Sequence, residues 1–495
     1  MKESPFDGDL SAKQFPLAVY VIFSLYIVGT VIDLNKPWIG AHDWNGAAWS
    51  TAAKHLIERP ISETRLGVSL DHGSGPLDPK KFYVHHPPLV VWLMAGAYKL
   101  FGVSETVGRL VPAVFTLVGA VFLGGIAAAF AGRRGGVFGT AVILLLPTQL
   151  YYGRMPNHEP IALPLMLVAA CFASMYRFQP TSFRLCGCLL AVALACLSSW
   201  PAFFFAATLG LVALRMPNGR TLFVGVAVTA SAVLAFLLWH IRFVRPDGWN
   251  ELLAAFFLRS GNVGVGEWVA TEANWLSRML TPVGAAAVVL HAARVVRLPA
   301  EAERAILPLV VAGWANVLLF RQGAFVHEYY AFYLGAPAAL IVGLTLSRNG
   351  TKSLIAIVLG ATVLSGLLVA SELRKEQSRL YASDVPESPR FVVELGKKIA
   401  EAFPSDATLL VDVAPIGEHL AFYADRRMVY LAQLTEAELG KVVGEVDGVV
   451  GNTRLQATRE LLNRVLALAG DRVVERREFG VEGHTFAAVR LKKGR

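Results

Sequence analysis

The sequence contains little charge. Charged residues make up 17% of the 495 residues and hydrophobic residues make up 55%, and the mean hydropathy is +0.50. Soluble domains carry more charge and fewer apolar side chains, which excludes a wholly soluble protein. The composition indicates a membrane protein with several spans and some soluble part. Basic cytoplasmic loops explain the net charge of +9 more simply than binding of nucleic acid does.

Other features are scarce or missing. The 4 cysteines lie in apolar runs, so we expect buried thiols and neither disulfides nor metal ligands; they are Cys171, Cys186, Cys188 and Cys196. No cleavable signal is evident, because residues 15–34 are long enough to remain as a span and no small-residue cleavage site follows them. The sequence shows no internal repeats and no low-complexity tract.

Apolar runs are abundant, and their lengths predict an α-helical polytopic membrane protein with about eleven spans. The predicted spans lie near residues 15–34, 105–131, 136–152, 161–177, 184–198, 201–215, 221–243, 281–296, 305–320, 329–346 and 354–371. With the N-terminus inside, every short cytoplasmic loop carries Arg or Lys, as the positive-inside rule requires. The loops 35–104 and 244–280 and the chain after about residue 372 would then lie outside.

The residues after about 385 follow a different pattern. Short β-rich runs alternate with amphipathic helices, which predicts a small α/β domain with a mainly parallel sheet. This region contains no glycine-rich phosphate loop. We therefore expect two domains: a transmembrane catalytic module over residues 1–372, with the outer loop 35–104, and an extracytoplasmic α/β domain over residues 373–495.

Asp43 is the first candidate for chemistry. It precedes a predicted helix over residues 44–57, so its carboxylate could cap the exposed N–H groups of that helix. It could also act as a general base or a metal ligand close to the membrane surface. The spacing alone favours the cap.

His85 and His86 form the second candidate. Two prolines and a predicted helix over residues 89–101 follow them, and proline suits the first turn of a helix. The motif could therefore simply start a helix that lies along the membrane interface. The imidazoles could also contact a phosphate or a metal ion, and the residues leave both interpretations open.

A third polar segment is the short turn between the spans 136–152 and 161–177. It contains Arg154, His158 and Glu159, and the bland interpretation is a solvated turn. Together with Asp43, Glu159 would make a two-carboxylate site that binds a divalent cation or shares acid and base work.

A fourth polar segment lies at the start of the span 329–346. His327, Glu328, Tyr329 and Tyr330 follow one another there. Aromatic residues often anchor a helix at the membrane interface, which accounts for the two tyrosines better than for His327 and Glu328.

All four polar segments fall on one predicted side of the membrane, which indicates a site assembled from separate loops. A transporter or flippase of a lipid-linked sugar is the main alternative. It would keep charged groups near the middle of its spans, whereas the spans here are nearly free of acids. An enzyme is therefore favoured. A ligase or polymerase that uses diphosphate-linked oligosaccharides is a third possibility.

The order of these motifs resembles the GT-C glycosyltransferases, in particular the relatives of protein O-mannosyltransferases and of the lipid A aminoarabinose transferase. The resemblance covers about residues 20–345. The segments that carry it are His42-Asp43-Trp44, His86-Pro-Pro-Leu89, Lys99-Leu-Phe-Gly102, Arg109-Leu-Val-Pro112, the turn at Glu159, and His327-Glu-Tyr-Tyr330.

The resemblance implies a glycosyltransferase that moves a sugar from a polyprenyl-phosphate donor to a lipid, glycan or protein acceptor. Transfer would take place on the non-cytoplasmic face with inversion at the anomeric carbon. Asp43 matches the catalytic acid of the first outer loop, and Glu159 matches the acid of the second. Tyr329 and Tyr330 match an aromatic pair near the donor head group.

The contacts to the donor phosphate are less defined. His85 or His86 stands where relatives carry Lys or another polar residue before Pro-Pro. Arg259 and Arg321 are predicted outer-face cations that could hold the phosphate by charge. Expected partners are the donor, the acceptor and membrane lipids, and not nucleic acid.

The resemblance does not decide whether the reaction requires a metal ion, because relatives differ in their need for one. The candidate ligands of a divalent cation (Mg²⁺, Mn²⁺ or Zn²⁺) are Asp43, Glu159, His158 and His327. The expected location is a bacterial inner membrane, with the active site and the C-terminal domain on the periplasmic side.

Overall fold

The computed structural model describes residues 14–261, 263–375, 390–412, 417–431, 434–453 and 456–492. The chain forms two compact units. The first contains the chain up to Leu34, Val84–Ala97 and Thr106–Glu372; the second contains Asn35–Tyr83, Tyr98–Glu105 and the chain from Leu373 on. Most of the predicted outer loop thus clusters with the C-terminal part. The division into domains 1–372 and 373–495 as folding units stays a prediction.

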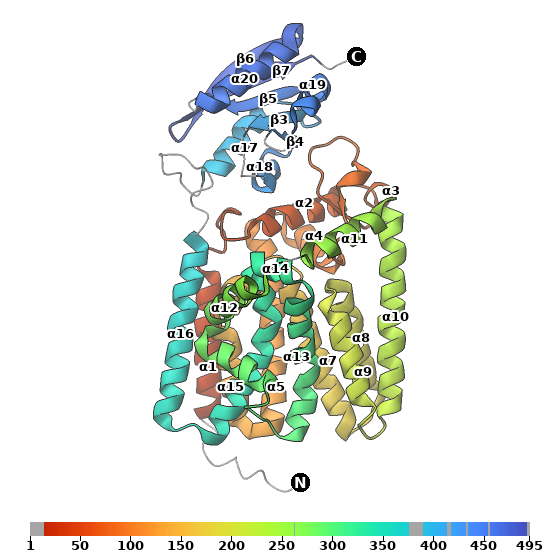
Figure 1. Ribbon diagram of the computed structural model, residues 1–495, viewed down its shortest axis with the longest axis vertical. Coiled ribbons are helices and arrows are strands. Elements are labelled where there is room, and N and C mark those ends of the chain that lie inside the picture. Colours follow the sequence, from red (N-terminus) through yellow and green to blue (C-terminus); the bar gives the residue numbers. More distant parts are fainter. Residues whose placement is uncertain are drawn as a thin grey trace. The chain divides into compact units, whose positions relative to one another are not determined.

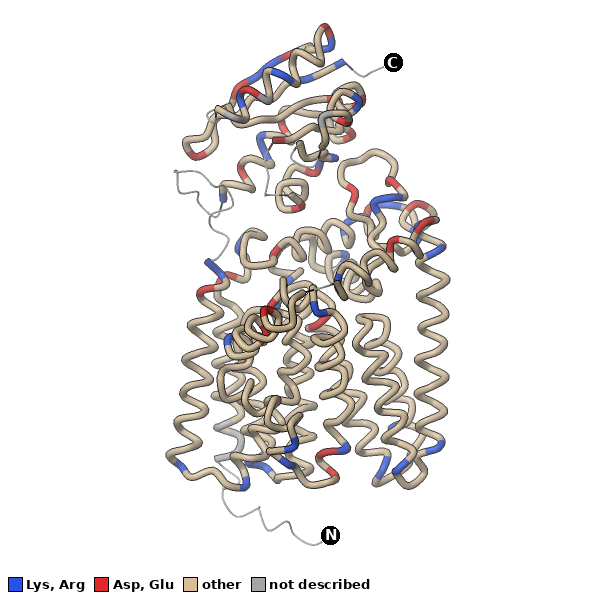
Figure 2. Tube along the Cα trace, in the orientation of Figure 1, with Lys and Arg blue, Asp and Glu red and all other residues tan. Residues whose placement is uncertain are grey.

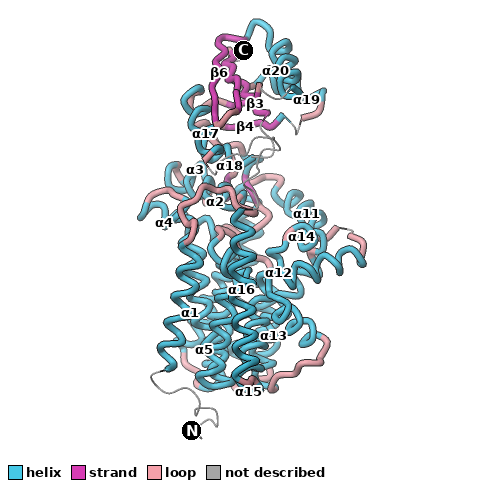
Figure 3. Tube along the Cα trace, turned by 90° about the vertical axis from the view of Figure 1, so that its left-hand side faces the viewer, coloured by secondary structure: helices cyan, strands magenta, loops and turns pink. Residues whose placement is uncertain are grey.

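The first unit is helical, as Figures 1 and 3 show. Its elements are α1 (Gln14–Val31), α4 (Leu89–Phe101, whose end lies in the second unit), α5 (Glu105–Leu145), α6 (Pro147–Tyr151), η2 (Tyr152–Arg154), α7 (Glu159–Phe178), α8 (Ser182–Ser198), α9 (Pro201–Ala213), α10 (Gly219–Val244), α11 (Gly248–Arg259), α12 (Val265–Ala292), α13 (Ala300–Leu319), α14 (Arg321–Val326), η3 (Glu328–Leu334), α15 (Gly335–Asn349) and α16 (Lys352–Lys375).

Helices of the first unit are long and apolar enough to cross a membrane. By length and composition, 6 qualify among the described residues: Glu105–Leu145, Glu159–Phe178, Gly219–Val244, Ala300–Leu319, Glu328–Asn349 and Lys352–Lys375. Shorter apolar helices are Val19–Val31, Leu89–Phe101, Ser182–Ser198 and Pro201–Ala213. The chain is therefore an integral membrane protein of mainly helical fold, and the count of about eleven spans stays a prediction.

Helix α5 turns back on itself, as the predicted spans 105–131 and 136–152 require. Ala131 and Gly132 leave the helical conformation, and Gly132 has a φ of 63°. A Cβ on Gly124 would lie 2.3 Å from the hydroxyl oxygen of Thr140, so the two halves lie side by side. Gly124 allows the close approach and Gly132 allows the turn.

One predicted span has different limits in the structure, and another, which lies within the candidate span Glu328–Asn349, begins with a 3₁₀ helix. Residues 281–296 were expected to form one span, but α12 starts at Val265 and breaks at Thr281, where φ is 64°. The first part of α12 contains charged residues, which lower its hydropathy, so the sequence did not mark it as part of a span; they are Glu267, Glu272 and Arg278. Residues 329–334, expected within a span, belong to the 3₁₀ helix η3 that leads into α15.

Basic residues gather at one end of the first unit (Figure 2). This end holds the turns between α7 and α8, between α9 and α10, and between α15 and α16 (Figure 1). Arg177 forms an ion pair with Glu301 there. The gathering of positive charge agrees with the predicted placement of the basic loops on one side of a membrane.

The cysteines are free thiols. Cys188 and Cys196 are buried and Cys171 is half-buried, but Cys186 is exposed, so the expectation of a buried thiol is wrong for Cys186. Successive residues of a helix are rotated by about 100°. Cys186 therefore lies on nearly the opposite face of α8 from Cys188.

The second unit contains a five-stranded sheet in the order β4-β3-β5-β7-β6. Its elements after residue 390 are α17 (Phe391–Ala402), β3 (Thr408–Asp412), α18 (Gly417–Ala424), β4 (Arg427–Tyr430), α19 (Glu436–Glu445), β5 (Gly448–Asn452), α20 (Gln456–Ala469), η5 (Gly470–Arg472), β6 (Val473–Val481) and β7 (His484–Leu491). They match the predicted alternation of strands and helices closely.

The sheet is mixed, which corrects the expectation of a mainly parallel sheet. Strand β3 pairs in parallel with β4 and β5, whereas β7 pairs antiparallel with β5 and β6. Only Glu482 and Gly483 connect β6 and β7, and both have positive φ. A two-residue turn of this kind can join only antiparallel strands, since a parallel pair needs a long crossover.

Helices cover both faces of this sheet. Leu409 and Val411 of β3 lie in one apolar cluster with residues of α17 and α18. Leu410 lies in a second cluster with residues of α19 and α20. Because side chains alternate between the faces of a strand, the result is a three-layer α/β/α arrangement.

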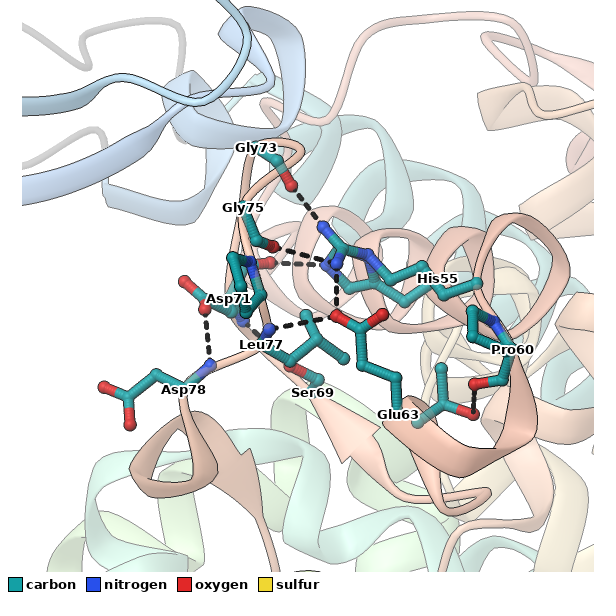
Figure 4. A network of polar contacts seen from close by, with 12 residues as sticks. His55, Pro60, Glu63, Ser69, Asp71, Gly73, Gly75, Leu77 and Asp78 are labelled. Carbon is teal, nitrogen blue, oxygen red and sulfur yellow. Dashed lines mark hydrogen bonds and ion pairs between the residues drawn. The ribbon is translucent and has the colours of Figure 1, made fainter.

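The loop region of the second unit contains α2 (Trp44–Glu58), α3 (Ile61–Thr64), β1 (Val68–Ser69), η1 (Pro79–Lys81) and β2 (Phe82–Tyr83). Hydrogen bonds fold its middle part compactly (Figure 4). The Arg59 guanidinium donates to Glu63 and to the carbonyl oxygens of Gly73 and Gly75. The Asp71 carboxylate accepts from the backbone N–H of Asp78 at 2.8 Å. The predicted outer loop is therefore an ordered structure.

Candidate functional site

The Asp43 carboxylate is buried and held by the backbone before it. Its Oδ2 atom accepts hydrogen bonds from the N–H groups of Ile39 at 3.1 Å and Gly40 at 2.8 Å. Only 5% of Asp43 is exposed. Two donors that converge on one oxygen fix the orientation of the carboxylate.

Asp43 does not cap helix α2. It stands directly before Trp44, but its side chain makes no hydrogen bond to the first turn of α2. An N-cap residue normally adopts an extended backbone, whereas Asp43 has a φ of −63° and a ψ of −5°. The interpretation of Asp43 as a side-chain cap of the helix is therefore wrong. Its carboxylate faces the loop 39–40.

His85 belongs to a polar group in the first unit. Its Nε2 atom lies 2.9 Å from Glu251 of α11, and Arg245 donates to the same Glu251 carboxylate at 2.9 Å. The indole N–H of Trp200 donates to the His85 carbonyl at 2.7 Å. Burial lowers the pKa of His85, and the nearby Arg259 lowers it further, against the opposing influence of Glu251.

His86 and His158 stack on each other. Their ring centroids are 3.6 Å apart and the ring planes differ by 23°. His158 Nε2 lies 3.4 Å from Oε1 of Glu159, and both side chains are 7% exposed. Burial lowers the pKa of His86 well below its usual value, and burial lowers that of His158 to about 3. Both rings are therefore neutral near pH 7, which permits the close stack.

The positive charge of Arg259 influences this histidine cluster. The positive charge of Arg259 acts on His86, His158 and Glu159. Arg259 closes α11 and is half-buried. Arg321 begins α14 and is also half-buried. Of the two predicted phosphate-binding cations, Arg259 is the one whose charge acts on His86 and Glu159.

Aromatic rings line a second part of the first unit. The Tyr152 hydroxyl donates to the Glu328 carboxylate at 2.7 Å, and Tyr152 also packs on Tyr329 with ring centroids 5.7 Å apart. The ring of His327 stacks on those of Tyr329 and Tyr330. Tyr329 thus lies beside Tyr152, the residue that donates to the buried Glu328.

Two arginines of the predicted motifs hold helix α1. The Arg154 guanidinium donates to the carbonyl oxygens of Thr30 and Ile32, and Arg109 donates to the carbonyl of Leu34 at 3.0 Å. Carbonyl groups at the end of a helix lack partners within it, and cationic side chains often supply them. Arg109 and Arg154 thus fasten the end of α1 and the residues after it.

The candidate metal ligands do not form a metal centre by themselves. Over the described ranges, no group of at least three His, Cys, Asp or Glu side chains is placed to hold a metal ion. His158 and Glu159 are adjacent, whereas His327 contacts the tyrosines. We therefore derive no reaction step through a metal ion.

The structure brings together residues from distant predicted segments. His86 meets His158, which lies beside Glu159. His85 meets Glu251, which the sequence analysis did not select. Asp43 lies in the other compact unit, so its pairing with Glu159 stays a prediction. Tyr152, Arg245 and Glu251 were also missed. Only their polarity beside apolar helices could have marked them.

The fold of the whole chain is shared with membrane glycosyltransferases of known structure. The crystal structure of ArnT from Cupriavidus metallidurans bound to undecaprenyl phosphate matches with a TM-score of 0.68 at 14% identity, over 97% of this chain and 98% of that chain. The Archaeoglobus fulgidus oligosaccharyltransferase in complex with Zn and sulfate matches with a TM-score of 0.52 at 14% identity, over 94% and 72%. The arabinofuranosyltransferase AftD from Mycobacteria matches with a TM-score of 0.51 at 13% identity, over 98% and 40%.

A family model described as dolichyl-phosphate-mannose-protein mannosyltransferase matches residues 85–242. The matched segment runs from His85 into α10 and includes the His86, His158 and Glu159 cluster. A comparison with curated proteins gives no match. The family model and the solved structures confirm, at the level of the fold, the GT-C resemblance that the motifs predict.

Proposed function

We propose that this protein is a glycosyltransferase that moves a sugar from a polyprenyl-phosphate donor to a lipid, glycan or protein acceptor. The observation that carries the proposal is the match over nearly the full length of both chains with an enzyme bound to undecaprenyl phosphate. The match covers 97% of this chain, so it extends over most of both compact units. A transporter is disfavoured, because the polar groups gather around helix ends.

In the proposed reaction, an acceptor oxygen or nitrogen attacks the anomeric carbon of the donor sugar. The bond between that carbon and the phosphate oxygen breaks, and polyprenyl phosphate leaves with the bonding electrons. Asp43 takes the proton of the acceptor, since its carboxylate is held in one orientation. Attack opposite to the leaving phosphate inverts the anomeric carbon.

Arg259 would stabilise the leaving phosphate by charge, with His85 and His86 as neutral hydrogen-bonding groups beside it. Arg321 is the alternative cation. Glu159 would bind hydroxyl groups of the sugar, and Tyr329 and Tyr330 would pack against the donor head group. If a divalent cation takes part, a carboxylate of the site would hold it and its charge would offset that of the leaving phosphate; the experiment below tests this with a chelator.

We further propose a bacterial inner membrane as the location, with the basic end of the first unit in the cytoplasm. The support is the gathering of Lys and Arg at one end (Figure 2), which is typical of cytoplasmic loops. The Asp43 loop and the residues from 373 on would then lie in the periplasm.

The test is turnover of a panel of polyprenyl-phosphate sugars by the purified protein and by Asp43→Asn, each with and without a chelator. We expect one donor to be consumed by the wild-type protein and not by the variant. Loss of turnover with chelator would establish the cation. Donor binding without turnover of any donor, with every acceptor class supplied, would overturn the proposal in favour of a transporter.

A further inference from the structure

The loop that carries Asp43 is bound along its length by the C-terminal part of the second unit. The N–H of Trp38 donates to the hydroxyl of Tyr423 in α18 at 2.9 Å. The N–H of Ala41 donates to the carbonyl of Leu373 at 3.1 Å. The intervening N–H groups of Ile39 and Gly40 are the ones that hold the Asp43 carboxylate. The donors to Asp43 are thus fastened on both sides.

Ile39 fixes this loop through its side chain as well. It is 4% exposed and belongs to the apolar cluster formed by α17, α18 and the sheet, with Leu420, Ala421 and Ala424 among its members. Withdrawing a buried Ile from such a core leaves a cavity and costs several kcal/mol in typical proteins. The backbone of Ile39 therefore cannot leave Asp43 without opening the C-terminal core.

Tyr423 is the centre of the polar contacts. Its hydroxyl accepts from Trp38 and donates to the Glu105 carboxylate at 2.6 Å. A Cβ on Gly396 would lie 2.6 Å from the Tyr423 Cβ, so α17 and α18 pack closely at this point. The hydroxyl group therefore has partners on both sides, and the packing at Gly396 restrains the Tyr423 side chain.

His419 lies on the same side of α18, four residues before Tyr423. It is 4% exposed. Its ring forms a hydrogen bond with the backbone of Trp38 and lies within electrostatic range of Asp43. Helix α18 thus contacts Trp38 twice, and the charge of Asp43 acts on its His419 ring.

Ion pairs beside this contact hold the same two parts together. Arg427 forms two hydrogen bonds with Asp71 at 2.9 and 2.6 Å, and Glu418 lies 2.7 Å from His72. Gly73 has a φ of +76°, and a Cβ there would lie 2.8 Å from the Ser405 carbonyl. The contact is therefore specific in charge and in shape.

We propose that helix α18 is part of the catalytic apparatus, in which Tyr423 and His419 are positioning residues that hold the Asp43 loop. The C-terminal domain then sets the geometry of the general base and is no mere accessory. This inference rests on the proposed function, because it takes Asp43 as the base.

The test is Tyr423→Phe, which removes one hydroxyl and keeps the ring in the core. Tyr430→Phe is the matched control, since it removes a hydroxyl that donates to Gly417 at the start of α18 and leaves the hydrogen bond from Trp38 to Tyr423 in place. Two readouts are needed: kcat and KM with the donor that the wild-type protein turns over, and hydrogen exchange of the amides at residues 38–40.

We expect Tyr423→Phe to lower kcat by roughly tenfold or more, because small displacements of a catalytic group are costly, with KM for the donor changed by less than about twofold. Amide exchange at residues 38–40 should become several times faster. Tyr430→Phe should match the wild-type protein in both readouts.

Normal kcat in Tyr423→Phe would overturn the inference, whether or not exchange became faster. A lower kcat with unchanged exchange at residues 38–40 would overturn it too, because the loop would not have been released. Absence of turnover by the wild-type protein would count against the proposed function itself. The two failures are therefore distinguishable.

Discussion

The two candidate acids, Asp43 and Glu159, are held in opposite ways. Asp43 is fixed by directed hydrogen bonds from the backbone of a loop, and that loop is held by α18. Glu159 is the first residue of α7 and lies beside neutral His158, in a cluster defined by burial and ring stacking. Both acids are equally buried, at 5% exposure, so exposure does not separate them.

The difference teaches that burial alone does not assign a role to an acid. Directed donors fix where a carboxylate points, which suits a group that must meet one proton of an acceptor. A carboxylate among neutral rings, with an arginine in range, suits the binding of polar or charged groups of a substrate. Asp43 should therefore be needed for the chemical step and Glu159 for binding.

The largest effect is expected for Asp43→Asn. The amide oxygen can still accept from Ile39 and Gly40, so the fold should persist, whereas the ability to take a proton is lost. We expect kcat to fall by roughly 10²- to 10⁴-fold. Transfer assays measure the change, with thermal unfolding in detergent as the control. Retention of most activity would remove the basis for contrasting the two acids.

A smaller effect is expected for Glu159→Gln. The substitution keeps the shape and replaces the carboxyl group beside His158 by an amide. If Glu159 binds the sugar, KM for the donor should rise by roughly tenfold, about the contribution of one hydrogen bond, and kcat should change less. A fall in kcat alone would give Glu159 the role assigned to Asp43.

A third variant tests, through the stability of the fold, the ion pair between Arg427 and Asp71, which lies beside the contact that holds the Asp43 loop. Arg427→Gln leaves the Asp71 carboxylate, whose side chain is 1% exposed, without its cation. Since Arg427 itself is 30% exposed, we expect a loss of about 2 kcal/mol, less than for a fully buried pair. Denaturant unfolding in detergent would measure it.

Arg476→Gln is the matched control for Arg427→Gln, because Arg476 pairs with Glu478 on the exposed strand β6. An exposed pair contributes little, so the loss should stay below about 0.5 kcal/mol. Equal losses in the two variants would mean that the Asp71 pair contributes nothing special to holding the loop.

The local elements could be predicted from the sequence. Run lengths place α7, α8 and α10 within a few residues, and alternation of strands and helices places β3 to β7. Local chemistry determines these features. The antiparallel pairing of β7 was not predicted, because its only mark in the sequence is the two-residue turn at Glu482 and Gly483.

The functional contacts could be predicted only in part. The four polar segments were recognisable, but their partners were not, because the partners lie far away in the sequence. Trp38 and Tyr423 are 385 residues apart, and His85 and Glu251 are 166 apart. Side-chain type limits what a residue can bind, whereas packing of the whole chain decides which partner it meets.

The last expected effect concerns acid stability of the Asp43 region, through His55 of α2 (Figure 4). The Arg59 side chain donates to His55 Nδ1 at 3.0 Å, and His55 Nε2 lies 2.7 Å from the Asp71 carbonyl. The ring is therefore neutral, with its proton on Nε2. Burial lowers the pKa of His55 from 6.5 to about 4, and Arg59 adds to this effect.

The pKa of His55 is lower in the folded protein than in the unfolded chain. The unfolded chain therefore binds a proton at His55 as the pH falls below 6.5, whereas the folded protein binds it only near pH 4. Stability from this group is complete above pH 6.5 and is lost as the pH falls toward 4, by on the order of 2 kcal/mol. His55→Gln keeps a donor and an acceptor without titrating, so its unfolding midpoint should decline less between pH 7 and pH 4.5. An equal decline in both proteins would show that protonation of His55 does not destabilise the region.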